Sequence, residues 1–134
     1  MPSKIRLQRI GDRIKEELSE MLLKEVNDPR LAGTMVTDVR VDRELTFADI
    51  FVSAVEGRER EQEILRGLRS AVGFLRHELA MRVDLRTFPR LRFHWDMTPE
   101  KADHIERLLA DLRAGRQPGE TVPPEPDAEV DEDE

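Results

Sequence analysis

Hydrophobic and polar positions at the start of the chain follow the period of a helix. Over residues 4–26 the apolar residues recur mainly at steps of three and four, which places them on one face of an α-helix. These residues are Ile10, Ile14, Leu18, Met21 and Leu22. The residue before a proline is disfavoured in the helical conformation, so we predict that this helix ends before Pro29 and that a loop covers 28–34.

Three later segments alternate apolar and polar residues with the period of a β-strand, over 35–41, 46–55 and 90–96. The residues expected to share a face are Met35, Thr37, Val39 and Val41 in the first segment, Ala48, Ile50, Val52 and Ala54 in the second, and Leu91, Phe93 and Trp95 in the third. Residues 42–45 would connect the first two strands as a hairpin.

Residues 58–82 have a helical pattern that Ser70-Ala71-Val72-Gly73 interrupts. Glycine inside a helix costs about 1 kcal/mol relative to alanine, so we predict a kink or a break there. A last helix would follow, with Thr98 as its cap, Pro99 at its first position and Gly115 as its end. This order predicts an α+β sandwich of two layers, in which helices cover one face of a three-stranded sheet.

Charge divides the chain into two segments. All 22 Lys and Arg residues lie within 1–116, whereas eight of the 29 Asp and Glu residues lie within 117–134. The first segment therefore carries a net charge of +1 and the second −8. We predict one domain over 1–115 and a disordered acidic tail over 116–134, because the tail has almost nothing apolar to bury. The low isoelectric point thus does not argue against nucleic-acid binding by the domain.

Composition also limits the compartment and the chemistry. No cysteine is present, which excludes disulfides and Cys-ligated zinc. No apolar run approaches membrane-spanning length, and none follows the basic residues at the N-terminus, so we expect a cytoplasmic protein with no membrane contact.

Catalytic and metal-binding patterns are weak. His77-Glu78 begins like a zinc-protease motif, but the second histidine would fall at Met81. His94 and Asp96 lie two apart on a predicted strand and could reach one metal, with no third ligand in view. We therefore expect no enzyme, no cofactor and no small-molecule substrate. A metal-dependent hydrolase that uses His94 and Asp96 stays as an alternative.

Basic residues gather in three groups. They are Lys4, Arg6, Arg9 and Arg13 on the first helix; Arg66, Arg69 and Arg76 around the interruption; and Arg82, Arg86, Arg90 and Arg92 near the last strand. No acidic residue occurs within 65–77, and arginine without a neighbouring carboxylate suits phosphate contacts. Because we place Phe74 and Phe93 in the core, we expect aromatic stacking to contribute little. The alternative from another class is a protein–protein adaptor whose arginines only keep it in solution.

An ordered set of segments resembles one known family. They are Leu7-Gln-Arg-Ile10, Glu25-Val-Asn-Asp-Pro-Arg-Leu31, Val36-Thr-Asp-Val39, Ala48-Asp-Ile-Phe-Val-Ser53, Ala71-Val-Gly-Phe-Leu-Arg76, and Leu85-Arg-Thr-Phe-Pro-Arg-Leu-Arg-Phe93 followed by Asp96. Together they are similar to the ribosome-binding factor A family over about residues 4–112. The resemblance implies a KH-like fold of the second topology, with the usual Gly-x-x-Gly loop replaced by a helix kink at Ala71-Val72-Gly73.

The same resemblance implies a function and a site. A monomer would bind the free, immature small ribosomal subunit and its rRNA near the 5′ end and would aid late maturation, most needed in the cold. The expected RNA-binding residues are Lys4, Arg6, Arg9, Arg13, Arg66, Arg69, Ser70, Ala71, Gly73, Arg76 and Arg86. Arginines would hold phosphates, and the small residues Ser70, Ala71 and Gly73 would let the backbone approach the RNA closely.

Overall fold

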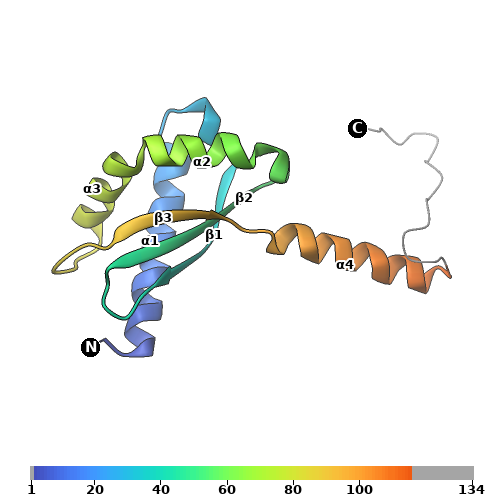
Figure 1. Cartoon of the computed structure of the whole chain (residues 1–134), viewed down its shortest axis with the longest axis horizontal. Helices are drawn as coiled ribbons and strands as arrows, with labels where there is room; N and C mark the ends of the chain where they lie inside the picture. The colour runs from blue at the N-terminus through green and yellow to red at the C-terminus, as the bar shows by residue number, and fades with distance from the viewer. Residues whose placement is uncertain (1, 116–134) are drawn as a thin grey trace. The chain divides into compact units, whose positions relative to one another are not determined.

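The computed structural model describes residues 2–115 (Figure 1). Its elements are α1 (Lys4–Lys24), η1 (Pro29–Leu31), β1 (Thr34–Val41), β2 (Phe47–Ala54), η2 (Arg58–Arg60), α2 (Glu61–Ser70), α3 (Val72–Arg82), β3 (Arg90–Trp95) and α4 (Thr98–Arg113). The strand order is β1-β2-β3, with β1 antiparallel and β3 parallel to β2. This confirms the predicted α+β class. The tail predicted over 116–134 lies outside the described residues.

The chain divides into two compact units, the first ending at Pro99 and the second beginning at Glu100. The core of the first unit joins α1, α2 and α3 to one face of the sheet (Figure 1). The predicted apolar faces of α1 and of the second strand are buried, and Leu68, Leu75 and Leu79 complete the layer. No helix among the described residues is long and apolar enough to cross a membrane.

A glycine in α1 allows a close approach between the helix and the sheet. A Cβ built on Gly11 would lie 2.7 Å from the carbonyl oxygen of Val39 in β1. That separation is too short for any side chain, so α1 can pack at this distance only because position 11 carries none. Gly11 was not singled out from the sequence, because a glycine inside a helical pattern gives no sign of what it packs against.

The predicted face of the first strand is correct at Val39 and Val41 but wrong before them. Val36 and Val39 are buried, whereas Met35 is 41% exposed. The pairing register with β2 shifts between Val36 and Asp38, and Thr37 is the extra residue of a β-bulge. One inserted residue moves the preceding side chains to the other face, which regular alternation does not reveal.

The break in the second helix is confirmed, but the predicted place of one neighbour is not. Helix α2 ends at Ser70 and α3 begins at Val72, joined by Ala71 with φ −95° and ψ 4°. Phe93 is buried as expected, but Phe74 is 48% exposed, so its predicted core position is wrong. Leu75 and Leu79 continue the helical spacing of Leu68 and occupy the core positions, so Phe74, one residue before Leu75, lies to one side.

The cap of the last helix also differs from expectation. Thr98 is the first residue of α4, and its N–H donates to Asp96 Oδ1 at 2.8 Å. The side chain that caps α4 is therefore that of Asp96, two residues before the first residue of the helix. Asp96 also accepts a hydrogen bond from the hydroxyl of Thr37 at 2.5 Å, so the same carboxylate joins the bulge of β1 to the end of β3.

Candidate nucleic-acid interface

A groove of about 420 Å³ lies where the helix break meets β3. It is lined by Arg69, Val72, Leu91, Arg92, Phe93 and His94. Figure 1 shows α2 and α3 running along β3, which is an edge strand of the sheet. The break and the last strand, which are about 20 residues apart in sequence, thus form one concave surface.

The backbone of β3 offers hydrogen-bonding groups on its outer edge. The N–H groups of Arg90 and Asp96 donate to Thr46 and Val52 of β2, each at 2.8 Å. In a parallel ladder the N–H and C=O of successive residues alternate between the two sides of the strand. The N–H and C=O of Leu91 and Phe93 therefore face away from β2, on the edge beside the break.

Helix α2 carries two exposed cations close to the break, of which Arg69 lines the groove and Arg66 lies three residues earlier. Arg66 and Arg69 are exposed, and within residues 2–115 neither has an ion pair or a hydrogen bond from its side chain. Other arginines of the fold do have such partners, for example Arg60 with Glu56 and Glu63. Arg66 and Arg69 are thus available to bind an anion that residues 2–115 do not supply.

The break supplies an open stretch of backbone. Ser70 and Gly73 are exposed, and Ala71 is half-buried. A Cβ built on Gly73 would meet nothing within 4 Å, and its φ is not positive, so the fold itself does not require glycine there. No side chain caps the first turn of α3. The structure therefore brings Arg66, Arg69, Ser70, Ala71 and Gly73 together, as the sequence predicts.

Arg76 is held by the protein. Its Nε donates to the carbonyl of Pro89 at 3.1 Å and its Nη2 donates to that of Phe88 at 2.6 Å. Both residues are buried, and they precede β3 directly. Arg76 thus ties α3 to the start of the edge strand, and a part in RNA binding stays a prediction.

We expect Arg76→Met to lower the free energy of unfolding by about 1–3 kcal/mol, because two buried carbonyl groups lose a charged donor. Arg69→Met, which removes an exposed and unpartnered guanidinium, should change it by less than about 0.5 kcal/mol. Urea denaturation of both variants measures the difference. Equal stabilities would show that the contacts of Arg76 contribute nothing to folding.

The remaining predicted residues lie elsewhere. None of the groove residues comes from α1, so Lys4, Arg6 and Arg9, all exposed, would act at another surface. Arg13 pairs with Glu17 at 3.0 Å and donates to the carbonyl of Arg82. Arg86 is exposed and lines a separate cavity of about 500 Å³ with Arg76 and Arg90, beside the β1–β2 turn.

The outer face of the sheet holds a network that sequence reasoning missed. Arg92 donates to both oxygens of Asp49, at 2.8 and 3.1 Å, and its guanidinium lies 3.9 Å from the ring centroid of Phe47. Arg40 lies over the ring of Phe51, and His94 stacks against the same ring with 5.0 Å between the centroids. The signal was present, since these positions alternate with the buried ones of β2 and β3.

This network does not support the hydrolase alternative. His94 Nε2 lies 2.8 Å from Asp49 Oδ1, whereas Asp96 binds Thr37 and caps α4. Each residue of the suggested pair thus has its own partner. Across residues 2–115, no group of three His, Cys, Asp or Glu side chains could hold a metal ion.

Asp49 makes stability depend on pH. The hydrogen bond from Arg92 is the main reason that the pKa of the Asp49 carboxyl is lowered, and His94 adds to it, while burial opposes both. A carboxyl with a lowered folded-state pKa stabilises the fold above its unfolded pKa and loses that contribution as pH falls through the folded value.

We therefore expect Asp49→Asn to lower the free energy of unfolding at neutral pH by up to about 1 kcal/mol, since Arg92 is half exposed. The difference from the unaltered protein should shrink below about pH 4. Urea unfolding at a series of pH values measures it. A difference that stays constant into acid would mean that charge at Asp49 is unimportant.

Comparison with known sequences identifies close relatives. The family model described as ribosome-binding factor A matches residues 6–109. The ribosome-binding factor A of Alcanivorax borkumensis is 42% identical over 110 residues, which cover 81% of this chain and 80% of that protein. That of Azoarcus sp. is 42% identical over 106 residues, or 79% of this chain and 84% of the other.

Solved structures give the same result. The crystal structure of ribosome-binding factor A from Thermus thermophilus superposes with a TM-score of 0.59 and 31% identity, covering 66% of this chain and 93% of that one. A homology model of the T. thermophilus protein, fitted into a cryo-EM map of its complex with the 30S subunit, has a TM-score of 0.56 and 30% identity, covering 68% and 96%. Both similarities extend over most of the first unit.

Proposed function

Because the chain belongs to the ribosome-binding factor A family, a family of non-enzymatic ribosome maturation factors with a KH-like fold of the second topology, we propose that it binds the free, immature small ribosomal subunit through the groove between the helix break and β3. The observation that carries this proposal is the pair of exposed arginines, Arg66 and Arg69, which have no partner in the described part of the chain and lie beside an open backbone. The T. thermophilus relative fitted into a map of a 30S complex supports the choice of partner.

Phosphates are the first ligands of this groove. The guanidinium groups of Arg66 and Arg69 can each donate two parallel hydrogen bonds to a phosphate. Gly73 leaves space in which the RNA backbone can come close to the start of α3. These contacts fix the position of the protein on the RNA but read no sequence.

Bases are the second ligands. An unpaired nucleotide can place its hydrogen-bonding edge against the free N–H and C=O groups of Leu91 and Phe93 on β3. A base held in a duplex cannot, because its edge is already paired. The groove therefore favours single-stranded or looped rRNA over regular helices.

Binding of this kind can promote maturation without catalysis. A protein that binds one rRNA conformer more tightly than the others increases the population of that conformer. Stabilising the productive fold near the 5′ end of the rRNA would aid late maturation and rRNA processing in the cytoplasm, above all in the cold, when misfolded RNA rearranges slowly. Release would follow once the mature subunit no longer presents that conformer.

One observation favours the alternative of a protein–protein adaptor. Leu23 is 81% exposed and Met35 is 41% exposed, and both line a groove of about 270 Å³ between α1 and β1. An apolar surface of this kind could contact a neighbouring protein on the subunit. It would hardly respond to salt, in contrast to phosphate contacts.

A salt titration of RNA binding separates the two functions. For a single-stranded RNA, the logarithm of the affinity should fall linearly with the logarithm of the salt concentration, with a slope that reports the number of phosphates neutralised. If the folded protein does not bind RNA even at low salt, direct RNA binding is excluded and the adaptor function remains.

A further inference from the structure

Phe74 has an exposure that the fold does not explain. Among the aromatic side chains in residues 2–115, Phe88 and Phe93 are buried and Phe47 and Phe51 are half-buried beneath arginines. Phe74 alone of the phenylalanines falls in the exposed class, with 48% of its surface open to solvent. It lies in the first turn of α3, two residues after the start of that helix.

The residues on the N-terminal side of Phe74 are small. On α3 it follows Gly73, beside which a Cβ would meet nothing within 4 Å. One helical turn before it lie Ser70 and Ala71, and one turn after it lie His77, which is exposed, and Glu78, whose carboxylate pairs with Arg82 at 3.4 Å. Side chains of a helix lean toward its N-terminus, so the ring of Phe74 extends toward the small residues and away from His77.

The charge nearby favours a nucleotide over a protein as the ligand. No acidic residue occurs within 65–77, and Arg66 and Arg69 have no partners within residues 2–115. On α2 and α3 the exposed large apolar side chains are Phe74 and Met81 alone. Two such residues are far from the ~800 Å² that each partner buries in a stable protein interface.

We propose that Phe74 is a base-stacking site for an unpaired nucleotide of the RNA bound at the helix break. This rests on the proposed function, because Arg66 and Arg69 hold the phosphates of the same strand. Stacking on an aromatic ring requires an exposed face of the base and tolerates any sequence. Phe74 thus adds a preference for unpaired RNA that phosphate contacts alone do not give.

The test compares variants at position 74 on two RNAs. Phe74→Ala should bind a single-stranded RNA of about 12 nucleotides roughly tenfold more weakly than the unaltered protein. Its affinity for a duplex of the same sequence and its salt slope should be unchanged, because the phosphate contacts remain. Phe74→Trp should restore binding to the single strand, and Phe74→Leu should not. Met81→Ala, which removes another exposed apolar side chain of α3, is the matched control.

The outcomes separate this site from the proposed function. If Phe74→Ala binds the single strand as tightly as the unaltered protein and with the same salt slope, the stacking proposal is overturned and the proposed function stands. Equal losses on single strand and duplex would also overturn it, since they would indicate a general defect. If the unaltered protein binds neither RNA, both proposals fail. Quenching of a 2-aminopurine base in the single strand by the unaltered protein, absent with Phe74→Ala, would support stacking directly.

Discussion

Replacing Arg66 and Arg69 together with glutamate should weaken binding to single-stranded RNA by more than about a hundredfold at moderate salt. Two charge-assisted contacts are lost, each worth about 1.5–3 kcal/mol, and two negative charges are placed against the phosphates. The slope of the logarithm of affinity against that of salt should fall by about two. Fluorescence anisotropy across a salt series measures both quantities.

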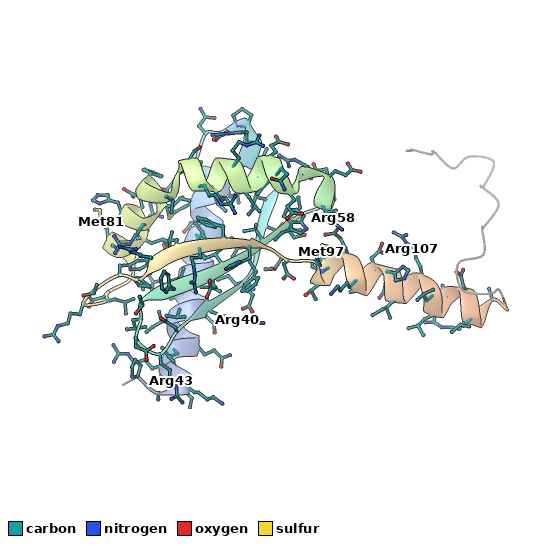
Figure 2. All side chains as sticks on the ribbon, viewed as in Figure 1. Arg40, Arg43, Arg58, Met81, Met97 and Arg107 are labelled. Atoms are coloured by element: carbon teal, nitrogen blue, oxygen red, sulfur yellow. The ribbon has the colours of Figure 1, made fainter. Side chains whose placement is uncertain are left out.

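Two further variants make this result specific. Arg43→Glu changes an arginine at the β1–β2 turn that is also exposed and has no partner within residues 2–115, and it should bind RNA nearly as the unaltered protein does (Figure 2). Replacing Arg66 and Arg69 with lysine keeps the charge but removes bidentate donation, and should give an intermediate loss. Unchanged binding by the double glutamate variant would move the site to Lys4, Arg6 and Arg9 on α1.

Gly11→Ala should lower the free energy of unfolding by about 2 kcal/mol. Alanine normally stabilises a helix relative to glycine by about 1 kcal/mol, but here its Cβ would lie 2.7 Å from the carbonyl oxygen of Val39. That neighbour is backbone and cannot turn aside, so α1 and β1 must separate and the core beneath them loosens. Urea denaturation at neutral pH measures the effect. A variant as stable as the unaltered protein would show that α1 can shift freely.

Gly73→Ala is the matched substitution and should have the opposite effect on stability. No atom lies within 4 Å of the new Cβ and the φ of Gly73 is not positive, so alanine should stabilise α3 by about 0.5–1 kcal/mol. If the RNA backbone approaches closely at the break, the same variant should bind RNA more weakly despite being more stable. Unchanged RNA affinity would contradict a close approach at Gly73.

The parts of the fold that obey a regular period could be predicted from the sequence. The apolar stripe of α1 and the alternation of β2 each give a face that one sheet or one helix can bury, and the structure buries them. The break at Ala71 was also predictable, because Gly73 weakens the helix locally. In each case the signal is local, so no knowledge of distant contacts was needed.

The errors have two sources. The bulge at Thr37 reverses the faces at the start of β1, and a pattern that is read with a constant period does not reveal it. Phe74 lies beside the apolar stripe that Leu68, Leu75 and Leu79 continue across the break, so its size alone had suggested a core position. The extent of α4 was predicted, but its cap was not. Asp96 caps the helix, and its side chain also accepts a hydrogen bond from Thr37 at the bulge.

The candidate site was predictable only in part, because its local signals are visible in the sequence and its contacts between distant segments are not. The absence of acidic residues within 65–77 is visible in the sequence and correctly singles out Arg66 and Arg69 as unpartnered within residues 2–115. The other wall of the groove is the edge of β3, which depends on strand order and so on contacts between distant segments. The role of Arg76 was hidden likewise, because its partners are carbonyl groups more than ten residues away.

The central claim is that this protein recognises the free small subunit through its rRNA. Co-sedimentation of the purified protein with small subunits, large subunits and assembled ribosomes across a salt series tests it most directly. We expect retention on free small subunits that weakens steadily with salt and is lost in the Arg66→Glu, Arg69→Glu double variant. A folded protein that is absent from small subunits at low salt, or that binds all three particles equally, would contradict it.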